Sequence, residues 1–285
     1  MFDRCVSPIL TYGSEVWGLY THESIENVQI RFCKKILGVG SKTPTNAVLG
    51  DCGRFHMFIM CSLKCLKYWL KILELPQESL AKGCYDMLYS LDNVGKANWV
   101  TKVKNILFLY GFGEVWLNQG VRNVELFVNE FKQRLLDCEI QYWASKIIEM
   151  PKLRYYNRFK TLYEAEQYLF LNVPRKLKVA LAKFRMSSHN LEVECGRKSN
   201  VIMEDRLCKA CGHINLVNVE CEYHVVMNCY LYDDVRQKYI GRYIGNRSLY
   251  QFINLMGSQN DHMLVSLAIF IHNMFKIRQI FLSSL

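Results

Sequence analysis

Apolar residues recur at intervals of three and four along most of the chain, which is the spacing of one face of an α-helix. The first clear stripe consists of Ile25, Val28, Phe32 and Ile36. It stops before Gly38, and glycine is the residue that most often follows the end of a helix. The pattern predicts a helix that packs through these four side chains.

Further helical stripes follow. Thr43 and Pro44 are typical of the start of a short helix, because proline in the first turn loses no hydrogen bond. The next buried stripe is expected at Phe55, Phe58, Leu66, Trp69 and Leu73. A long amphipathic helix is expected at about 122–149, buried through Val124, Val128, Phe131, Leu135, Trp143 and Ile147 and ended by Pro151. Other helices are expected at about 78–91, 96–110, 155–170, 174–186, 232–242 and 261–282.

The fold class follows from this helical spacing of the apolar residues. Few segments alternate apolar and polar residues as a β-strand does. The sequence therefore predicts a mainly α fold, a multi-helix assembly with one small irregular module near the C-terminus. A hinge is predicted near residues 150–152, where the charge balance changes.

Composition supports a folded protein. The chain has 285 residues, of which 51% are apolar and 22% charged, so it can fill a hydrophobic core. The longest apolar run near the C-terminus, residues 263–275, is shorter than the roughly 20 residues of a membrane span. The N-terminal residues lack the features of a secretory signal. We therefore expect an intracellular protein without a membrane segment, and the sequence does not distinguish nucleus from cytoplasm.

The charge is strongly basic and unevenly placed. The formal net charge is +10, and residues 152–203 hold eleven basic and four acidic residues, an excess of seven. Charge concentrated in this way is costly unless an anionic partner relieves it, and nucleic acid is the commonest such partner. The segment is therefore expected to bind RNA or DNA.

The strongest local motif is a group of potential metal ligands. Cys208 and Cys211 are separated by two residues, and His224 and Cys229 follow. This Cys3His spacing is typical of a closed, structural zinc site without an open position for water. His213 and Cys221 are alternative ligands on spacing alone. The basic neighbours Arg206 and Lys209 are expected to favour the thiolate form of the cysteines.

Basic and aromatic residues interleave before this motif, a pattern that grips single-stranded nucleic acid through phosphates and stacked bases. Tyr156, Phe159 and Tyr163 lie at helical spacing and are interpreted as core, whereas Tyr155 is assigned to the surface. The predicted contact residues are Lys152, Arg154, Tyr155, Arg158, Lys160, Arg175, Lys176, Lys178, Lys183, Arg185, Arg197 and Lys198.

Catalytic motifs are not found. Asp233 and Asp234 resemble the paired aspartates of a polymerase, but the spacing from the preceding tyrosines is wrong. The pair is better placed at the start of a helix, where acidic residues favour the positive end of the dipole. The chain is therefore not expected to be an enzyme by itself.

Several segments of the chain match a pattern found in one known protein family. In the N-terminal part these are residues 8–18 (PILTYGSEVWG), 32–39 (FCKKILGV) and 43–50 (TPTNAVLG). In the C-terminal part they are residues 184–197 (FRMSSHNLEVECGR), followed by Arg206, Cys208, Glu220, His224, Cys229, Tyr232 and Arg236. Together these segments resemble the C-terminal part of reverse transcriptases from non-LTR (LINE-type) retrotransposons, which ends in a CCHC zinc finger. Cys221 departs from the family, which commonly has an acidic residue at this place.

The resemblance implies an organisation and a function. It divides the chain into a thumb-like helical region (1–75), a helical connector (76–150), a basic helical region (151–203), a CCHC zinc-finger-like module (204–231) and C-terminal helices (232–285). It implies binding of RNA or target DNA with a structural Zn²⁺, and a polymerase domain with its catalytic aspartates outside this chain. The alternative interpretation is a helical protein-interaction module, or a decayed retroelement product without selected activity.

Overall fold

The structure is a computed structural model that describes residues 2–20 and 22–285. Its described part is mainly helical, and β-pairing there is limited to one bridge between Leu207 and Val219. The prediction of a mainly α fold is confirmed.

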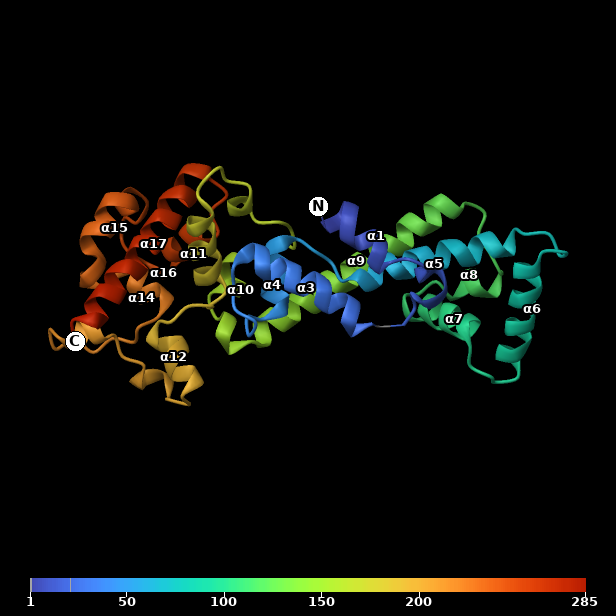
Figure 1. The fold of residues 1–285 in the computed structure, drawn as a ribbon, viewed down its shortest axis with the longest axis horizontal. Coiled ribbons are helices and arrows are strands. Elements are labelled where there is room, and N and C mark those ends of the chain that lie inside the picture. The colour runs from blue at the N-terminus through green and yellow to red at the C-terminus, as the bar shows by residue number, and fades with distance from the viewer. Residues whose placement is uncertain (1, 21) are drawn as a thin grey trace. The chain divides into compact units, whose positions relative to one another are not determined.

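The helices form two compact units (Figure 1). Unit 1 comprises Met1–Gln29 and Phe55–Tyr142, and unit 2 comprises Ile30–Arg54 and Trp143–Leu285. Helices α3 (Glu23–Leu37) and α9 (Val124–Glu149) contribute residues to both units. Unit 2 thus includes residues 30–54 of the predicted thumb-like region. Its second stretch begins at Trp143, ahead of the hinge predicted at residues 150–152.

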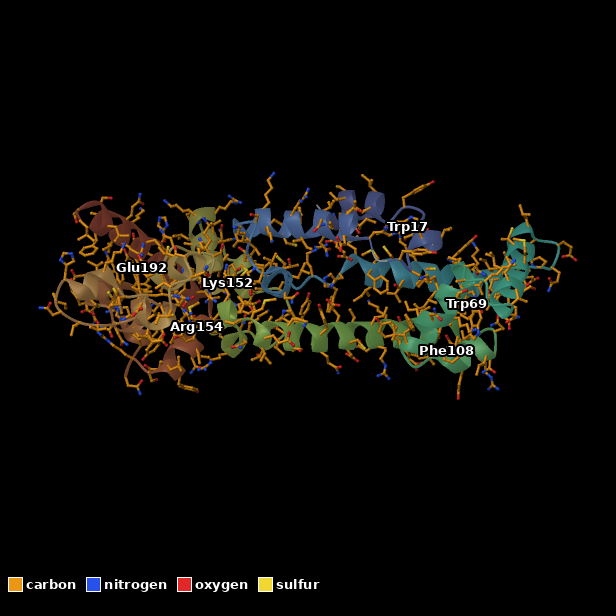
Figure 2. The ribbon with its side chains drawn as sticks, turned by 90° about the horizontal axis from the view of Figure 1, so that it is seen from below. Trp17, Trp69, Phe108, Lys152, Arg154 and Glu192 are labelled. Atoms are coloured by element: carbon orange, nitrogen blue, oxygen red, sulfur yellow. The ribbon has the colours of Figure 1, made fainter. Side chains whose placement is uncertain are left out.

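Unit 1 is built around helix α5. Its other helices are α1 (Ser7–Leu10), α2 (Ser14–Trp17), α6 (Leu80–Asn93), α7 (Trp99–Leu109) and α8 (Gly113–Leu117). Trp69 of α5 (Met57–Leu73), labelled in Figure 2, is fully buried, and its ring stacks on Trp116 at 5.9 Å between centroids. Leu66 and Phe131 are buried in the same core, as their stripes predicted.

The buried face of α3 differs from the prediction. Val28 and Ile36 are exposed, whereas Gln29, Cys33 and Leu37, each one residue later, are buried. The amide of Gln29 donates to the carbonyl of Phe55 (2.9 Å), so a polar residue occupies the position expected of an apolar one. The predicted stripe for this helix was wrong by one position, because a buried glutamine and cysteine do not register as apolar in the pattern.

The start of α5 carries an ion pair that we expect to make unit 1 sensitive to pH. His56 precedes α5, and its Nδ1 bonds the carboxylate of Glu139. That hydrogen bond raises the pKa of His56, with burial acting in the opposite direction. The stabilisation is complete below the ordinary histidine pKa of about 6.5 and is lost as the pH rises through the raised value.

Urea unfolding at about pH 6 and about pH 9 measures this effect. We expect the wild type to lose stability between these values. His56→Ala and Glu139→Gln should each reduce the loss, because neither retains the charged pair. An equal loss in all three proteins would contradict the assignment.

Unit 2 packs its helices on α17. Its elements are α4 (Thr45–Cys52), α10 (Tyr156–Phe159), α11 (Arg175–Arg185), α12 (Glu192–Lys198), α13 (Lys209–Gly212), α14 (Glu222–Met227), α15 (Asp233–Tyr239), α16 (Leu249–Met256) and α17 (Asp261–Ser283). Single-turn segments occur at Phe2–Val6 in unit 1 and at Pro151–Leu153, Gln167–Leu169, Met203–Asp205, Tyr230–Tyr232 and Gly241–Tyr243 in unit 2. Helices α11, α15 and α16 contact α17 (Figure 1).

The helix predicted at 155–170 was wrong. Helix α10 ends at Phe159, and the chain then turns irregularly, with extended backbone at Lys160. The turn brings Ala165 so close to Gly53 that a Cβ at Gly53 would lie 2.3 Å from the Ala165 nitrogen. Tertiary contact here overrides the helical spacing, although Tyr156 and Phe159 are buried as predicted.

Helix α17 is the one described helix that is long and apolar enough to cross a membrane. Its best window has a mean hydropathy of 1.2, and 39% of that window is buried inside the structure. Core helices of soluble proteins meet the same criteria. Leu267 and Phe270 are fully buried against other helices of unit 2. The absence of a membrane segment stays a prediction.

Candidate metal centre and basic surface

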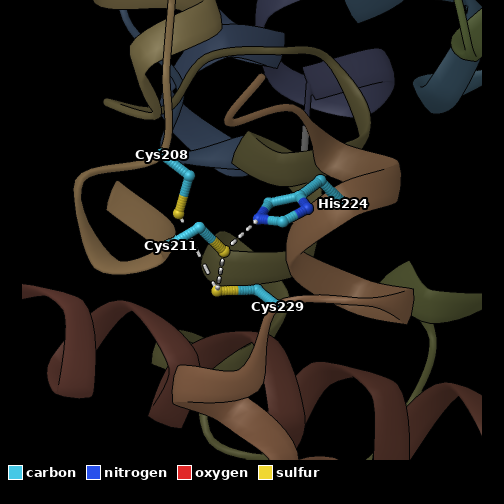
Figure 3. Close-up of side chains that lie close together, drawn as sticks. All are labelled: Cys208, Cys211, His224 and Cys229. Atoms are coloured by element: carbon cyan, nitrogen blue, oxygen red, sulfur yellow. Dashed lines mark hydrogen bonds between the residues drawn. The ribbon is translucent and has the colours of Figure 1, made fainter. Parts of the chain in front are cut away.

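Three cysteines and one histidine of unit 2 converge on one point (Figure 3). Cys208, Cys211, His224 and Cys229 are all buried, and their ligand atoms all lie within 4.8 Å of one another. These are the four residues that the sequence spacing selected. Together they can hold a metal ion.

The separations between the ligand atoms fit a tetrahedral ion. The Sγ atoms of Cys208 and Cys229 are 3.8 Å apart, and those of Cys211 and Cys229 are 4.0 Å apart. Nε2 of His224 lies 3.4 Å from Sγ of Cys211. Bonds of about 2.3 Å from a tetrahedral zinc ion to two sulfur atoms place those atoms about 3.8 Å apart. The cluster therefore has the size that such an ion requires.

A tight turn positions the first two cysteines. Cys208 precedes α13, and the N–H of Gly212 donates to the Cys208 carbonyl (3.0 Å). The N–H of Cys208 donates to the carbonyl of Asn218 (2.7 Å), beside the bridge between Leu207 and Val219. This pairing closes the loop and directs both thiols to the same side.

Helix α14 positions the other two ligands. His224 lies in α14 and Cys229 follows it, with the N–H of Cys229 donating to the His224 carbonyl (2.9 Å). The buried guanidinium of Arg236 donates to the carbonyls of Val225, Val226 and Cys229. It therefore caps the end of α14. Sequence reasoning gave Arg236 no role, because its partners are backbone carbonyls that no motif reveals.

The two alternative ligands lie outside the cluster. His213 is exposed, and its ring contacts Phe281 instead. Cys221 is buried but its Sγ lies 3.7 Å from the hydroxyl of Tyr155. Neither His213 nor Cys221 is therefore among the four clustered residues, which include Cys208.

Arg206 and Lys209 do not act on the cysteine thiols as expected. Arg206 donates to the carbonyls of Val193 and Val201, and Lys209 pairs with Glu192 at 3.4 Å. These cations are therefore engaged elsewhere. The hydrogen bond with the Cys229 thiol instead lowers the pKa of Cys208, against the effect of burial.

Two carboxylates, four and two residues before His224, connect the cluster to the rest of unit 2. Glu220 accepts from Nε and Nη2 of Arg278 on α17, at 2.8 and 2.6 Å. Glu222 pairs with Arg154 and accepts from Nε2 of His189 at 3.1 Å. Burial acts to raise the pKa of Glu222, but the bond to His189 and the charge of Arg154 lower it to about 2.

Two of the predicted nucleic-acid contacts are buried, so their assignment to an exposed surface was wrong. Arg185 has a fully buried side chain and pairs with Asp51 (3.1 Å) and Glu166 (2.8 Å). Lys160 is 2% exposed and also pairs with Glu166, at 2.7 Å. Acidic residues of the same unit neutralise these charges, so no external anion is needed at either position.

Three further cations of the basic segment are paired within unit 2. Lys152 lies 3.8 Å from Glu194, and Arg197 lies 3.2 Å from the same carboxylate. Arg154, labelled with Lys152 in Figure 2, pairs with Glu222. The basic excess of the segment is thus partly compensated inside the protein.

Tyr155 and Lys178 are half-buried. The Tyr155 ring packs edge-on against Phe252 at 5.2 Å between centroids, which occupies part of the surface expected to stack on bases. Lys178 donates to the carbonyl of Leu169 (2.9 Å). The remaining predicted contacts are exposed and make no ion pair within the described part of the chain: Arg158, Arg175, Lys176, Lys183 and Lys198.

Fold and site together define the class: a mainly helical protein with a buried Cys3His centre that can hold a metal ion. No protein-family model, curated protein or solved structure matches the chain.

Proposed function

We propose that the Cys3His centre holds a structural zinc ion and that unit 2 binds RNA or DNA through phosphate contacts. The proposal follows the resemblance to the C-terminal part of LINE-type reverse transcriptases. It contains no chemical step for this chain. In a longer retrotransposon protein, the polymerase domain would be a second partner of this chain, besides RNA or DNA.

The donor set supports zinc as the metal. Soft thiolate ligands in a tetrahedral arrangement suit zinc, whereas hard cations such as Mg²⁺ and Ca²⁺ prefer oxygen ligands. Three cysteines and one histidine fill all four positions and leave none for water. All four side chains are buried, which also favours a structural role over catalysis.

The observation that supports nucleic-acid binding is the pair of exposed lysines on α11. Lys176 and Lys183 are exposed, are two turns apart on one face of the helix, and pair with no acid among the described residues. Other cations of the basic segment are neutralised internally, but these two are available to an anionic partner. Regularly placed cations suit the regularly placed phosphates of a nucleic acid.

Binding should therefore fall steeply with salt. We expect affinity for a single strand to drop roughly 50-fold between about 50 and about 200 mM salt if four phosphates are contacted. Fluorescence anisotropy with labelled single-stranded RNA and with duplex DNA measures the change.

A probe of the same length and scrambled sequence is the matched control. It should bind equally, because phosphate contacts do not read bases. Affinity that ignores salt would overturn the proposal, as would the absence of binding to both kinds of probe.

A further inference from the structure

Helices α11 and α17 enclose a groove of about 660 Å³ in unit 2. Lys176, Val179 and Lys183 of α11 form one wall, and His272, Phe275 and Gln279 of α17 form the other. Its volume lies within the range of about 300–1,000 Å³ that is typical of sites for small molecules and single groups. The groove can therefore admit part of a single strand, and it is too small for a duplex.

The charges of the groove favour an anionic occupant. No acidic side chain is among its described lining residues, and Lys176 and Lys183 make no ion pair within the described chain. Arg278 also lines the groove, but Glu220 already pairs with it. Burial, together with the charges of Lys276 and Lys176, lowers the pKa of His272. The imidazole is thus neutral near pH 7, and the lysines supply the positive potential.

The groove also offers an apolar surface beside these charges. Phe275 is half-buried, and its ring packs edge-on against Phe184 at 6.2 Å between centroids. Val179 contributes aliphatic surface on the opposite wall. Cationic side chains next to an aromatic ring are the combination by which proteins bind single-stranded nucleic acid without reading its sequence.

We infer that the α11–α17 groove binds a single-stranded segment of RNA or DNA, with phosphates at Lys176 and Lys183 and a base against Phe275. This inference rests on the proposed function and specifies its site. An acidic peptide would satisfy the lysines but would leave the aromatic ring without a stacking partner.

The test uses the full chain with its metal and a labelled oligothymidylate of about 12 nucleotides. We expect the double variant Lys176→Glu, Lys183→Glu to weaken binding about tenfold or more, since two phosphate contacts become repulsive. Phe275→Leu should weaken it about fivefold or more by removing the ring while keeping an apolar side chain. Gln279→Glu, at an exposed residue, should also weaken binding by placing a carboxylate in the groove.

Matched controls change the same charge elsewhere. Lys96 and Lys132 are exposed in unit 1 and have no ion pair in the described chain, so their double reversal controls for net charge. Asn254→Asp, at an exposed position of α16, is the control for Gln279→Glu. We expect both controls to stay within about twofold of the wild type. Circular dichroism verifies that each variant is folded.

Two outcomes would overturn the inference and leave the proposed function standing. In the first, the groove variants bind as the wild type does, while reversal of Arg158 and Lys198 weakens binding. In the second, a polyglutamate peptide displaces the probe from the groove as effectively as unlabelled oligonucleotide. If the wild type binds no nucleic acid at all, the proposed function falls as well.

Discussion

Loss of the metal is expected to unfold residues 204–219, which include the loop that holds Cys208 and Cys211, the largest effect that a small change to this protein should have. This loop has little core of its own, because Ile214, Leu216 and Val217 are exposed, whereas Val225, Val226 and Met227 of α14 are fully buried in the core of unit 2. Binding of structural zinc contributes on the order of 10 kcal/mol of apparent folding free energy in small fingers. Without it, the loop that holds Cys208 and Cys211 keeps only a few backbone hydrogen bonds.

Cys208→Ser tests this expectation. We expect about one zinc per wild-type chain after purification in reducing buffer, and loss of that zinc in the variant. Amide hydrogen exchange should show lost protection across residues 204–219. Cys195→Ser is the matched control, because Cys195 lies outside the cluster and its thiol hydrogen bond to the Asn190 carbonyl is one that serine can also make.

The effect should extend beyond the finger. Glu220 and Glu222 lie four and two residues before His224 and bind Arg278 and His189, which line the α11–α17 groove. Metal loss should therefore reduce protection of the groove as well as of the finger. Full metal content and unchanged exchange in Cys208→Ser would contradict the assignment of Cys208 as a ligand.

The ligand set could be predicted from the sequence because metal ligands carry a chemical signature. Three cysteines and a histidine at these spacings have few other uses, and the structure brings together the four that were chosen. Long helices were predictable for a similar reason. In α9, Phe131, Leu135 and Trp143 are buried as the apolar period required.

The basic surface was predicted less well because charge does not reveal its partner. Arg185 and Lys176 look alike in the sequence, and only the fold brings Arg185 to Asp51, 134 residues away. The same limit applies after α10, where the close approach of Ala165 to Gly53 replaces the expected continuation of the helix. Local patterns describe the residues of one segment, whereas these features depend on pairs that are distant in the chain.

Disruption of the buried Asp51–Arg185 pair is expected to destabilise unit 2 by about 3–5 kcal/mol. Both side chains are fully buried, and the Asp51 carboxylate also accepts from the hydroxyls of Tyr156 and Tyr168, each at 2.9 Å. Arg185→Met keeps an apolar stem of similar length but leaves Asp51 charged and without its cation. An unpaired buried charge costs far more than the net value of the pair that it came from.

Urea unfolding monitored at Trp143, the tryptophan of unit 2, measures the loss. Lys146→Met is the matched control, because its pair with Glu149 is exposed and should contribute little to stability. The double variant Asp51→Asn, Arg185→Met removes both charges and should lose less than the sum of its single variants, because no lone charge remains at the pair. Additive losses, or an Arg185→Met variant as stable as the control, would show that Asp51 finds another cation or water when Arg185 is absent.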